Sequence, residues 1–194
     1  QIPKEYLDAR MSDVSGKFTI SNNTVHVDQL RGNVAGLSYT VNGLIDGLDK
    51  NEPIKLNVKV DPFDVPADPA FWRKRSAKAF DRFPGSGTIS GYINVERAAA
   101  GGEMTKDGLI QIRDAKGYYS KFPYTLQNVK ADIRLHNDRI EVVNVAGIGL
   151  HGGRVMVTGQ IAPVAENAAV DLTVTAVGLP VDDLLRDALN DKEQ

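Results

Sequence analysis

The residues of this sequence that are best suited to chemistry are a glycine motif, three histidines and one serine. Gly147, Gly149 and Gly152 have the G-x-G-x-x-G spacing of dinucleotide-binding loops. Such a loop must be followed by a helix, because the helix N-terminus holds the pyrophosphate. Residues 154–157 follow here, and they alternate like a strand. The motif therefore predicts turns or bulges between strands, not a nucleotide site.

The histidines and the serine lack the neighbours that metal binding or catalysis requires. His26, His136 and His151 lie in different segments without a metal-ligand spacing, so no metal site is expected. Ser86 lies in a Gly-Ser-Gly sequence, which predicts a turn before a strand, and not in the G-x-S-x-G sequence of a hydrolase. Scattered carboxylates leave a glycosidase pair as an open alternative. We expect no catalytic residues and no cofactor, and we expect that the protein is not an enzyme.

Composition narrows the class of protein further. The 194 residues are 42% hydrophobic and 25% charged, with a formal net charge of −2 and no Cys. This length fits one large domain or two small ones. The missing Cys excludes thiol catalysis, and the missing basic excess argues against nucleic acid as a partner. No apolar run approaches the roughly 18–20 residues of a membrane-spanning helix, and residues 1–15 do not resemble a signal peptide.

Apolar and polar residues alternate along almost the whole chain, which predicts strands with one apolar and one wet face. Residues 22–23, 46–47, 137–138 and 152–153 between them are Asn, Asp and Gly, which favour tight turns and antiparallel neighbours. The predicted strands are 14–20, 25–27, 37–41, 54–60, 89–95, 110–112, 129–135, 140–142, 155–157 and 170–174.

Two segments have helical spacing instead. A helix over 69–83 starts at Asp68-Pro69, and a C-terminal helix over about 181–190 has apolar residues at i, i+3, i+4, i+7 and i+8. Residues 98–108 lack periodicity and form the best internal boundary. We therefore predict two β-repeats, 1–100 and 101–194, each followed by one amphipathic helix. The apolar positions of the second helix are Val181, Leu184, Leu185, Ala188 and Leu189.

The two halves match each other at a period of about 115 residues. Val14 aligns with Val129, and the alignment runs to Gly32 over Gly147. After one inserted residue it resumes and continues to Val65 over Val181. Further aligned pairs are Phe18 and Ile133, Ile20 and Leu135, Asn22 and Asn137, Val25 and Ile140, Val27 and Val142, Tyr39 and Val155, Val41 and Val157, Gly43 and Gly159, Leu56 and Leu172, and Val58 and Val174.

Two helices are too few to cover the predicted apolar face. Nine or ten strands, about 4.8 Å apart and roughly 20 Å long, present about 900–1,000 Å². Each helix covers about 200 Å². The sheet must either close on itself as a sandwich or barrel, or curl into a trough that meets something apolar, such as lipid tails.

The pattern V-x-G-x-F-x-I-x-N-N-x-V-x-V-x-x-L-x-G over 14–32, and its second copy over 129–147, resembles the repeat of AsmA-like proteins, which include the TamB group. Residues 122–129, entering a strand, and 178–182, entering a helix, resemble that family too. The resemblance implies a long curved antiparallel sheet, or β-groove, similar to bridge-like lipid-transfer proteins. It also implies a periplasmic segment of a longer protein anchored in the inner membrane, with neighbouring repeats and roles in cell-envelope lipid transport and outer membrane biogenesis.

The expected function is non-enzymatic binding or conduction of phospholipid acyl chains along the apolar face. The alternative is a closed β-domain that acts as a scaffold or protein-interaction module, with the same residues as its core. The basic helix 69–83 either contacts an anionic membrane surface or packs on the sheet. The predicted lipid-binding residues are Phe18, Ile20, Val25, Val27, Tyr39, Val41, Leu56, Val58, Ile133, Leu135, Ile140, Val142, Val155, Val157, Leu172 and Val174.

Overall fold

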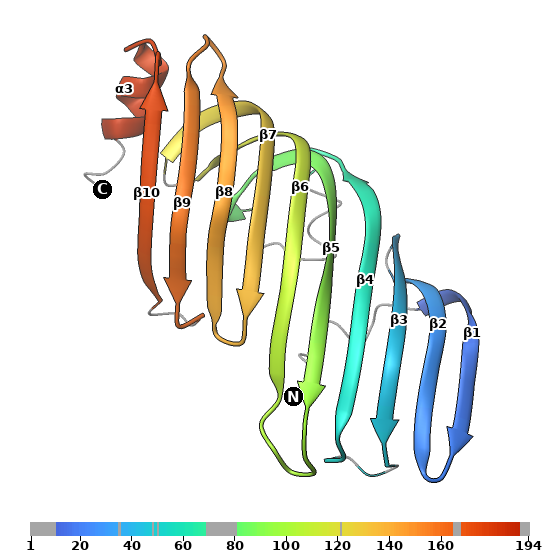
Figure 1. The fold of residues 1–194 in the computed structure, drawn as a ribbon. Helices are drawn as coiled ribbons and strands as arrows, with labels where there is room; N and C mark the ends of the chain where they lie inside the picture. The colour runs from blue at the N-terminus through green and yellow to red at the C-terminus, as the bar shows by residue number, and fades with distance from the viewer. Residues whose placement is uncertain are drawn as a thin grey trace. The chain divides into compact units, whose positions relative to one another are not determined.

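A computed structural model describes residues 11–34, 36–47, 49, 51–68, 81–120, 122–164 and 168–190. Ten strands form one sheet in chain order, so that each strand pairs with its neighbours in sequence (Figure 1). The predicted mainly β fold with antiparallel strands is confirmed. The strands are β1 (Met11–Ser21), β2 (Thr24–Val34), β3 (Leu37–Asp46), β4 (Ile54–Val65), β5 (Gly85–Arg97), β6 (Thr105–Tyr119), β7 (Phe122–His136), β8 (Arg139–Gly149), β9 (Arg154–Ala162) and β10 (Ala169–Val177).

The chain divides into two compact units whose segments alternate along the sequence. The first contains residues 1–63, 90–109 and 135–137, and the second contains 64–89, 110–134 and 138–194. Strands β1 to β3 belong to the first unit, and β8 to β10 belong to the second.

Tight turns join the strands at the predicted Asn and Gly positions. Asn22 and Asn23 connect β1 to β2 with φ of 49° and 65°. Two consecutive left-handed residues give the turn twist that matches paired strands, and Asn tolerates this conformation better than most residues. Asn137 has the same role between β7 and β8, with φ of 45°.

Irregular positions inside the strands reset the alternation of side chains. The β2–β3 register passes from Val27 directly to Leu30, and Gln29 between them has φ of 47°. The β8–β9 register makes the equivalent step from Val142 to Val145. Each extra residue is a β-bulge, which keeps the apolar residues before and after it on the same face.

Strand β6 is much longer than the predicted 110–112, and it begins inside the segment predicted to be a loop. Its first residues are polar, and pairing with the β7–β8 turn holds them. The Lys106 N–H donates to the Asn137 side-chain oxygen at 2.8 Å, and the Asn137 N–H donates to the Lys106 carbonyl at 2.8 Å. A long-range contact therefore extends a strand that local hydrophobicity does not mark.

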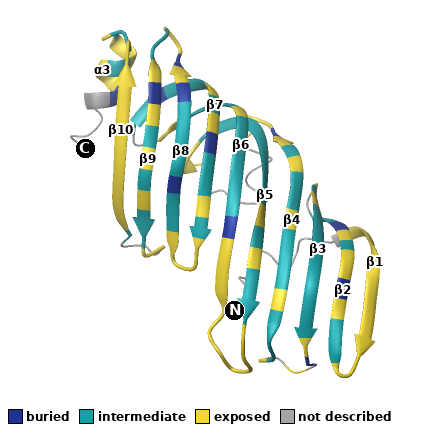
Figure 2. Cartoon of the chain, in the orientation of Figure 1, coloured by how far each residue is buried: buried dark blue, intermediate teal, exposed yellow. Residues whose placement is uncertain are grey.

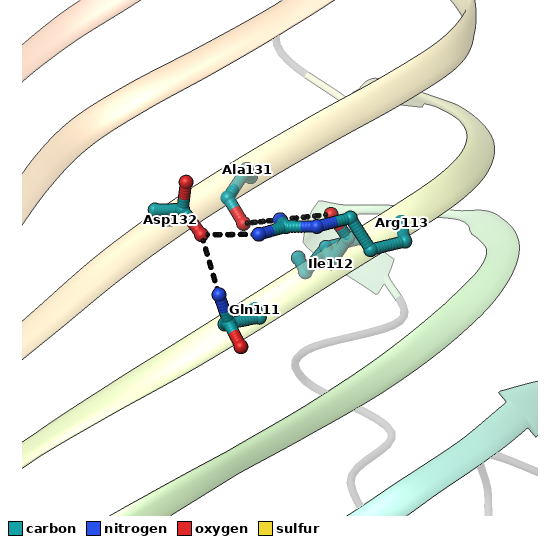
Figure 3. Close-up of polar contacts among 5 residues, drawn as sticks. All are labelled: Gln111, Ile112, Arg113, Ala131 and Asp132. Carbon is teal, nitrogen blue, oxygen red and sulfur yellow. Dashed lines mark hydrogen bonds and ion pairs between the residues drawn. The ribbon is translucent and has the colours of Figure 1, made fainter.

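A polar network on β6 and β7 satisfies backbone groups beside another irregular position, Asp114, which has φ of 51° (Figure 3). The Arg113 guanidinium donates to the carbonyls of Ile112 and Ala131, both at 2.8 Å, and to the Asp132 carboxylate at 2.7 Å. Gln111 also donates to Asp132. These hydrogen bonds, from Arg113 first and Gln111 second, lower the pKa of the Asp132 carboxyl.

The C-terminal helix α3 spans Asp183–Asn190, two residues shorter at its start than predicted. Asp182 ends the preceding extended segment, because its carboxylate accepts the Leu185 N–H at 2.9 Å as an N-cap. Val181 therefore lies outside the helix and is exposed, whereas Ala188 is fully buried. Most of the helix predicted over 69–83 lies outside the described residues; Asp81 and Arg82 are helical.

Gly43 and Gly159 hold the same close approach between neighbouring strands. They have φ of 146° and 140°. A Cβ on Gly43 would lie 2.0 Å from the Lys55 carbonyl oxygen, and one on Gly159 would lie 2.1 Å from that of Asp171. Only glycine fits such a position without moving the adjacent strand.

We expect Gly159→Ala to lower the free energy of unfolding by about 2–4 kcal/mol, because the new methyl must push β10 away from β9. Gly101→Ala is the matched control. Gly101 also has positive φ, 70°, but no atom lies within 4 Å of its Cβ position, so only about 1 kcal/mol of backbone strain is expected. Urea denaturation measures both; equal losses would contradict the steric explanation.

Candidate functional site

The first unit presents an unbroken apolar face on β1 to β4. The register aligns side chains in rows, and residues in one row share a face of the sheet. None of these rows contains a charged residue. They are Ile20, Val25, Ile45 and Ile54; Phe18, Val27, Gly43 and Leu56; Leu30, Val41 and Val58; Gly32, Tyr39 and Val60; and Val34 and Leu37.

The second unit presents rows of the same kind on β8 to β10. Again none contains a charged residue. They are Ile140, Ile161 and Val170; Val142, Gly159 and Leu172; Val145, Val157 and Val174; and Gly147, Val155 and Ala176.

Fourteen of the sixteen predicted lining residues fall in these rows, on the apolar face of their own unit. The other two, Ile133 and Leu135, lie on β7. A Cβ on Gly147 would meet the Val129 side chain at 3.0 Å, so Val129 shares the face of Gly147. Alternation along β7 from Val129 then turns Ile133 and Leu135 to the same side of their strand.

Sequence reasoning missed several face residues because it followed strict alternation. Leu30 and Val145 lie three positions after the preceding apolar residue of the face, just past the bulges. In both halves, two residues in place of one separate these apolar neighbours, and this spacing could have predicted the bulges. Three others, Val34, Ile45 and Ile161, lie beyond the ends of the predicted strands. Leu37, Ile54, Val60 and Val170 lie inside predicted strands but were not included among the predicted lining residues.

Few residues of the described strands are buried, and most are intermediate or exposed (Figure 2). Among the described residues, only seven apolar side chains are buried, and no large side chain is fully buried. Phe18 is 57% exposed and Ile20 is 67% exposed in the first unit, while Val174 is 61% exposed in the second. Burying such a side chain is worth about 1.5–3 kcal/mol, so these faces favour an apolar partner.

The opposite face is polar in the first unit. The register pairs Lys17 with Asp28 and Asn42 with Asn57. Asn57 also donates to the Asn94 side-chain oxygen at 2.7 Å. In the first unit the sheet therefore has one apolar side and one largely polar side, on which Leu44 lies between His26 and Lys55.

A cluster of Tyr124, His151 and Asp182 lies beside the start of α3. The His151 Nδ1 lies 2.6 Å from Asp182 Oδ2, while Oδ1 of the same carboxylate caps the helix. The hydrogen bond from Leu185, and then that from His151, lower the pKa of Asp182. Burial first, and then the Asp182 charge, raise the pKa of the Tyr124 hydroxyl, which has no hydrogen-bond partner among the described residues. We interpret this cluster as an anchor for α3.

The other candidate sites carry no assembled chemistry. The glycine motif lies at the β8–β9 connection and leads into a strand, as predicted. In the described part of the chain, no group of three or more His, Cys, Asp or Glu side chains could hold a metal ion. None of the described helices is long and apolar enough to cross a membrane.

The fold and this site define a mainly β protein whose sheet has an uncovered apolar face. Comparisons with protein-family models, with curated proteins and with solved structures find no match to this chain. The resemblance to AsmA-like proteins therefore stays a prediction.

We expect acid to loosen α3 before it unfolds the sheet. Because folding lowers the pKa of Asp182, its contribution is present above about pH 4 and is lost as the pH falls through the lower folded value. Asp182→Ala should remove that contribution and speed amide hydrogen exchange in 183–188 at neutral pH. Asp187→Ala, on the same helix, is the control. If both variants exchange like the parent chain, Asp182 does not anchor α3.

Proposed function

We propose that this chain is a non-enzymatic segment that binds phospholipid acyl chains on its apolar β-faces and conducts them along a β-groove in cell-envelope lipid transport. The observation that best supports this proposal is the register of strands β1 to β4 and β8 to β10. It gathers apolar side chains in rows without a charge, and it leaves many of them exposed.

Acyl chains suit these rows in both chemistry and shape. A lipid tail makes no hydrogen bonds, and the rows offer it none from side chains other than the Tyr39 hydroxyl. Each methylene removed from water contributes about 0.8 kcal/mol, so contact along several rows supplies enough free energy for binding. The polar opposite face keeps such a segment hydrated while the apolar face is occupied.

The proposal includes two tandem repeats, and matching irregular positions support them. Asp13 and Asn128 both have left-handed φ, of 54° and 52°. The sequence separation between Asp13 and Asn128 equals that between the aligned residues Val14 and Val129. The bulge after Val27 has its counterpart after Val142. Bulges are costly irregularities, so their recurrence at aligned places favours descent from one repeating unit.

The alternative of a closed β-domain is less well supported. A closed core would bury the same apolar side chains, but Phe18, Ile20 and Val174 are all more than half exposed. In the sheet order, β1 and β10 stand at the two ends. The lipid function therefore accounts better for the described faces.

The AsmA-like resemblance extends the proposal to the cell. It assigns the segment to the periplasm of a longer protein anchored in the inner membrane, with neighbouring repeats beside it. The predicted membrane contact of the helix 69–83 belongs to the same proposal.

Native mass spectrometry of protein purified without detergent tests the function. We expect bound phospholipid, and we expect Val58→Asp or Val157→Asp to reduce the bound fraction at least about tenfold, because a carboxylate against acyl chains is costly to desolvate. The matched controls are Thr40→Asp and Thr158→Asp, which place the same charge on the opposite face of β3 and β9.

Thermal denaturation of all four variants separates lost binding from lost folding. Folded controls that keep lipid, beside folded Val58→Asp and Val157→Asp variants that lose it, would support the proposal. A lipid-free, monomeric parent chain would refute it, as would equal lipid loss in all four variants.

A further inference from the structure

The outer edge of β10 is a regular strand edge without the features that usually block pairing. All nine residues of β10 are exposed (Figure 2). Its register with β9 runs without interruption from Ala169 to Val177. The strand contains one charged residue, Asp171, and neither Lys nor Pro. Long, flat, apolar edges of this kind readily accept a further strand.

The edge strand β1 is exposed as well, but its register and its charged residues differ from those of β10. Its register with β2 shifts twice, between Ser12 and Ser15 and again before Lys17. Asp13 has left-handed φ, and Lys17 places a charge in the strand. Bulges and lysines are common protection against edge pairing. The two ends of the strand order are therefore not equivalent as docking surfaces.

The pairing of β10 with β9 repeats the pairing of β4 with β3. Leu172 faces Gly159 in one pair, and Leu56 faces Gly43 in the other. In both, the glycine Cβ position would lie 2.9 Å from the leucine Cα. β10 thus pairs with β9 in the same geometry in which β4 pairs with β3.

In the pair of β4 with β3, the other side of β4 is paired with β5. Side chains add to this pairing, because Asn57 donates to Asn94 and Thr88 donates to Asp64, both at 2.7 Å. Thr173 takes the place of Asn57 on β10, between Leu172 and Val174. Its hydroxyl can bond a facing amide in the same way.

We propose that the outer edge of β10, which pairs with no other strand in the described part of the chain, binds an antiparallel strand of the β5 type. Such a strand has apolar residues alternating with Ser, Thr, Tyr or Asn, so that its apolar side continues the apolar face of the second unit. The proposal deepens the proposed function and rests on its two-repeat arrangement. It concerns the strand edge and not the lipid-facing rows.

A labelled peptide with the sequence of residues 85–97 is the probe. Fluorescence anisotropy with the full chain measures its binding, and a scrambled peptide is the first control. We expect saturable binding of the native-sequence peptide alone. Hydrogen exchange should slow at β10 amides on peptide addition and stay unchanged in β1.

Two N-methylated peptides test the mode of binding. In an antiparallel pair, only alternate residues of a strand hydrogen bond to a given neighbour. Methylating the amides of residues 88, 90, 92 and 94 in one peptide, and of 89, 91, 93 and 95 in the other, blocks opposite edges. We expect one peptide to bind and the other to bind at least about tenfold more weakly, because several hydrogen bonds are lost.

Several results would overturn the proposal. Equal binding of both methylated peptides would indicate adsorption to the apolar face. Protection of β1 or β4 amides in place of β10 would assign the peptide to another edge. Concentration-dependent protection of β10 without peptide would assign the edge to a second copy of the chain. Phospholipid content, measured on the same samples, reports separately on the proposed function.

Discussion

The register of hydrogen bonds between neighbouring strands is the constraint on which the other features of this protein depend. Side chains alternate between the two faces of a strand, so a slip of one residue would move every later apolar side chain to the wet face. The bulges at Gln29 and after Val142 show this constraint at work. By adding one residue at the right place, they keep Leu30 and Val145 in apolar rows. Gln29 accepts an unfavourable left-handed φ in exchange.

A sheet organised this way owes its stability to the backbone ladder and to pairs of side chains across strands. The described residues include few buried apolar side chains, so a packed interior contributes little there. Polar networks instead support the irregular places. Arg113 donates hydrogen bonds to two backbone carbonyls next to the irregular residue Asp114. Asp182 accepts the Leu185 N–H and so caps the start of α3. Covering the exposed apolar rows with a partner would therefore release hydrophobic free energy that folding alone does not.

The proposed repeats and the proposed lipid function have the same physical origin. A unit with an apolar face that it cannot cover alone gains from neighbours at its edges and from ligands on its face. The glycines Gly43 and Gly159 serve both needs, because they let adjacent strands approach closely while leaving the rows free of bulky groups. Because β10 is regular and β1 is irregular, a further strand is expected to add at the β10 end of the strand order and not at the β1 end.

The amino-acid sequence by itself determined the alternation, the turns and the faces, because these follow from side-chain type over a few neighbouring residues. Asn22 and Asn137 predict turns, and Phe18 and Val157 predict an apolar face. Tertiary structure decided what depends on distant pairing. Strand β6 begins at polar Thr105 because its start meets Asn137, and Leu30 joins the apolar face through the bulge against β3. The exposure of the apolar face also depends on tertiary structure, because burial is a property of the assembled sheet and not of any single strand.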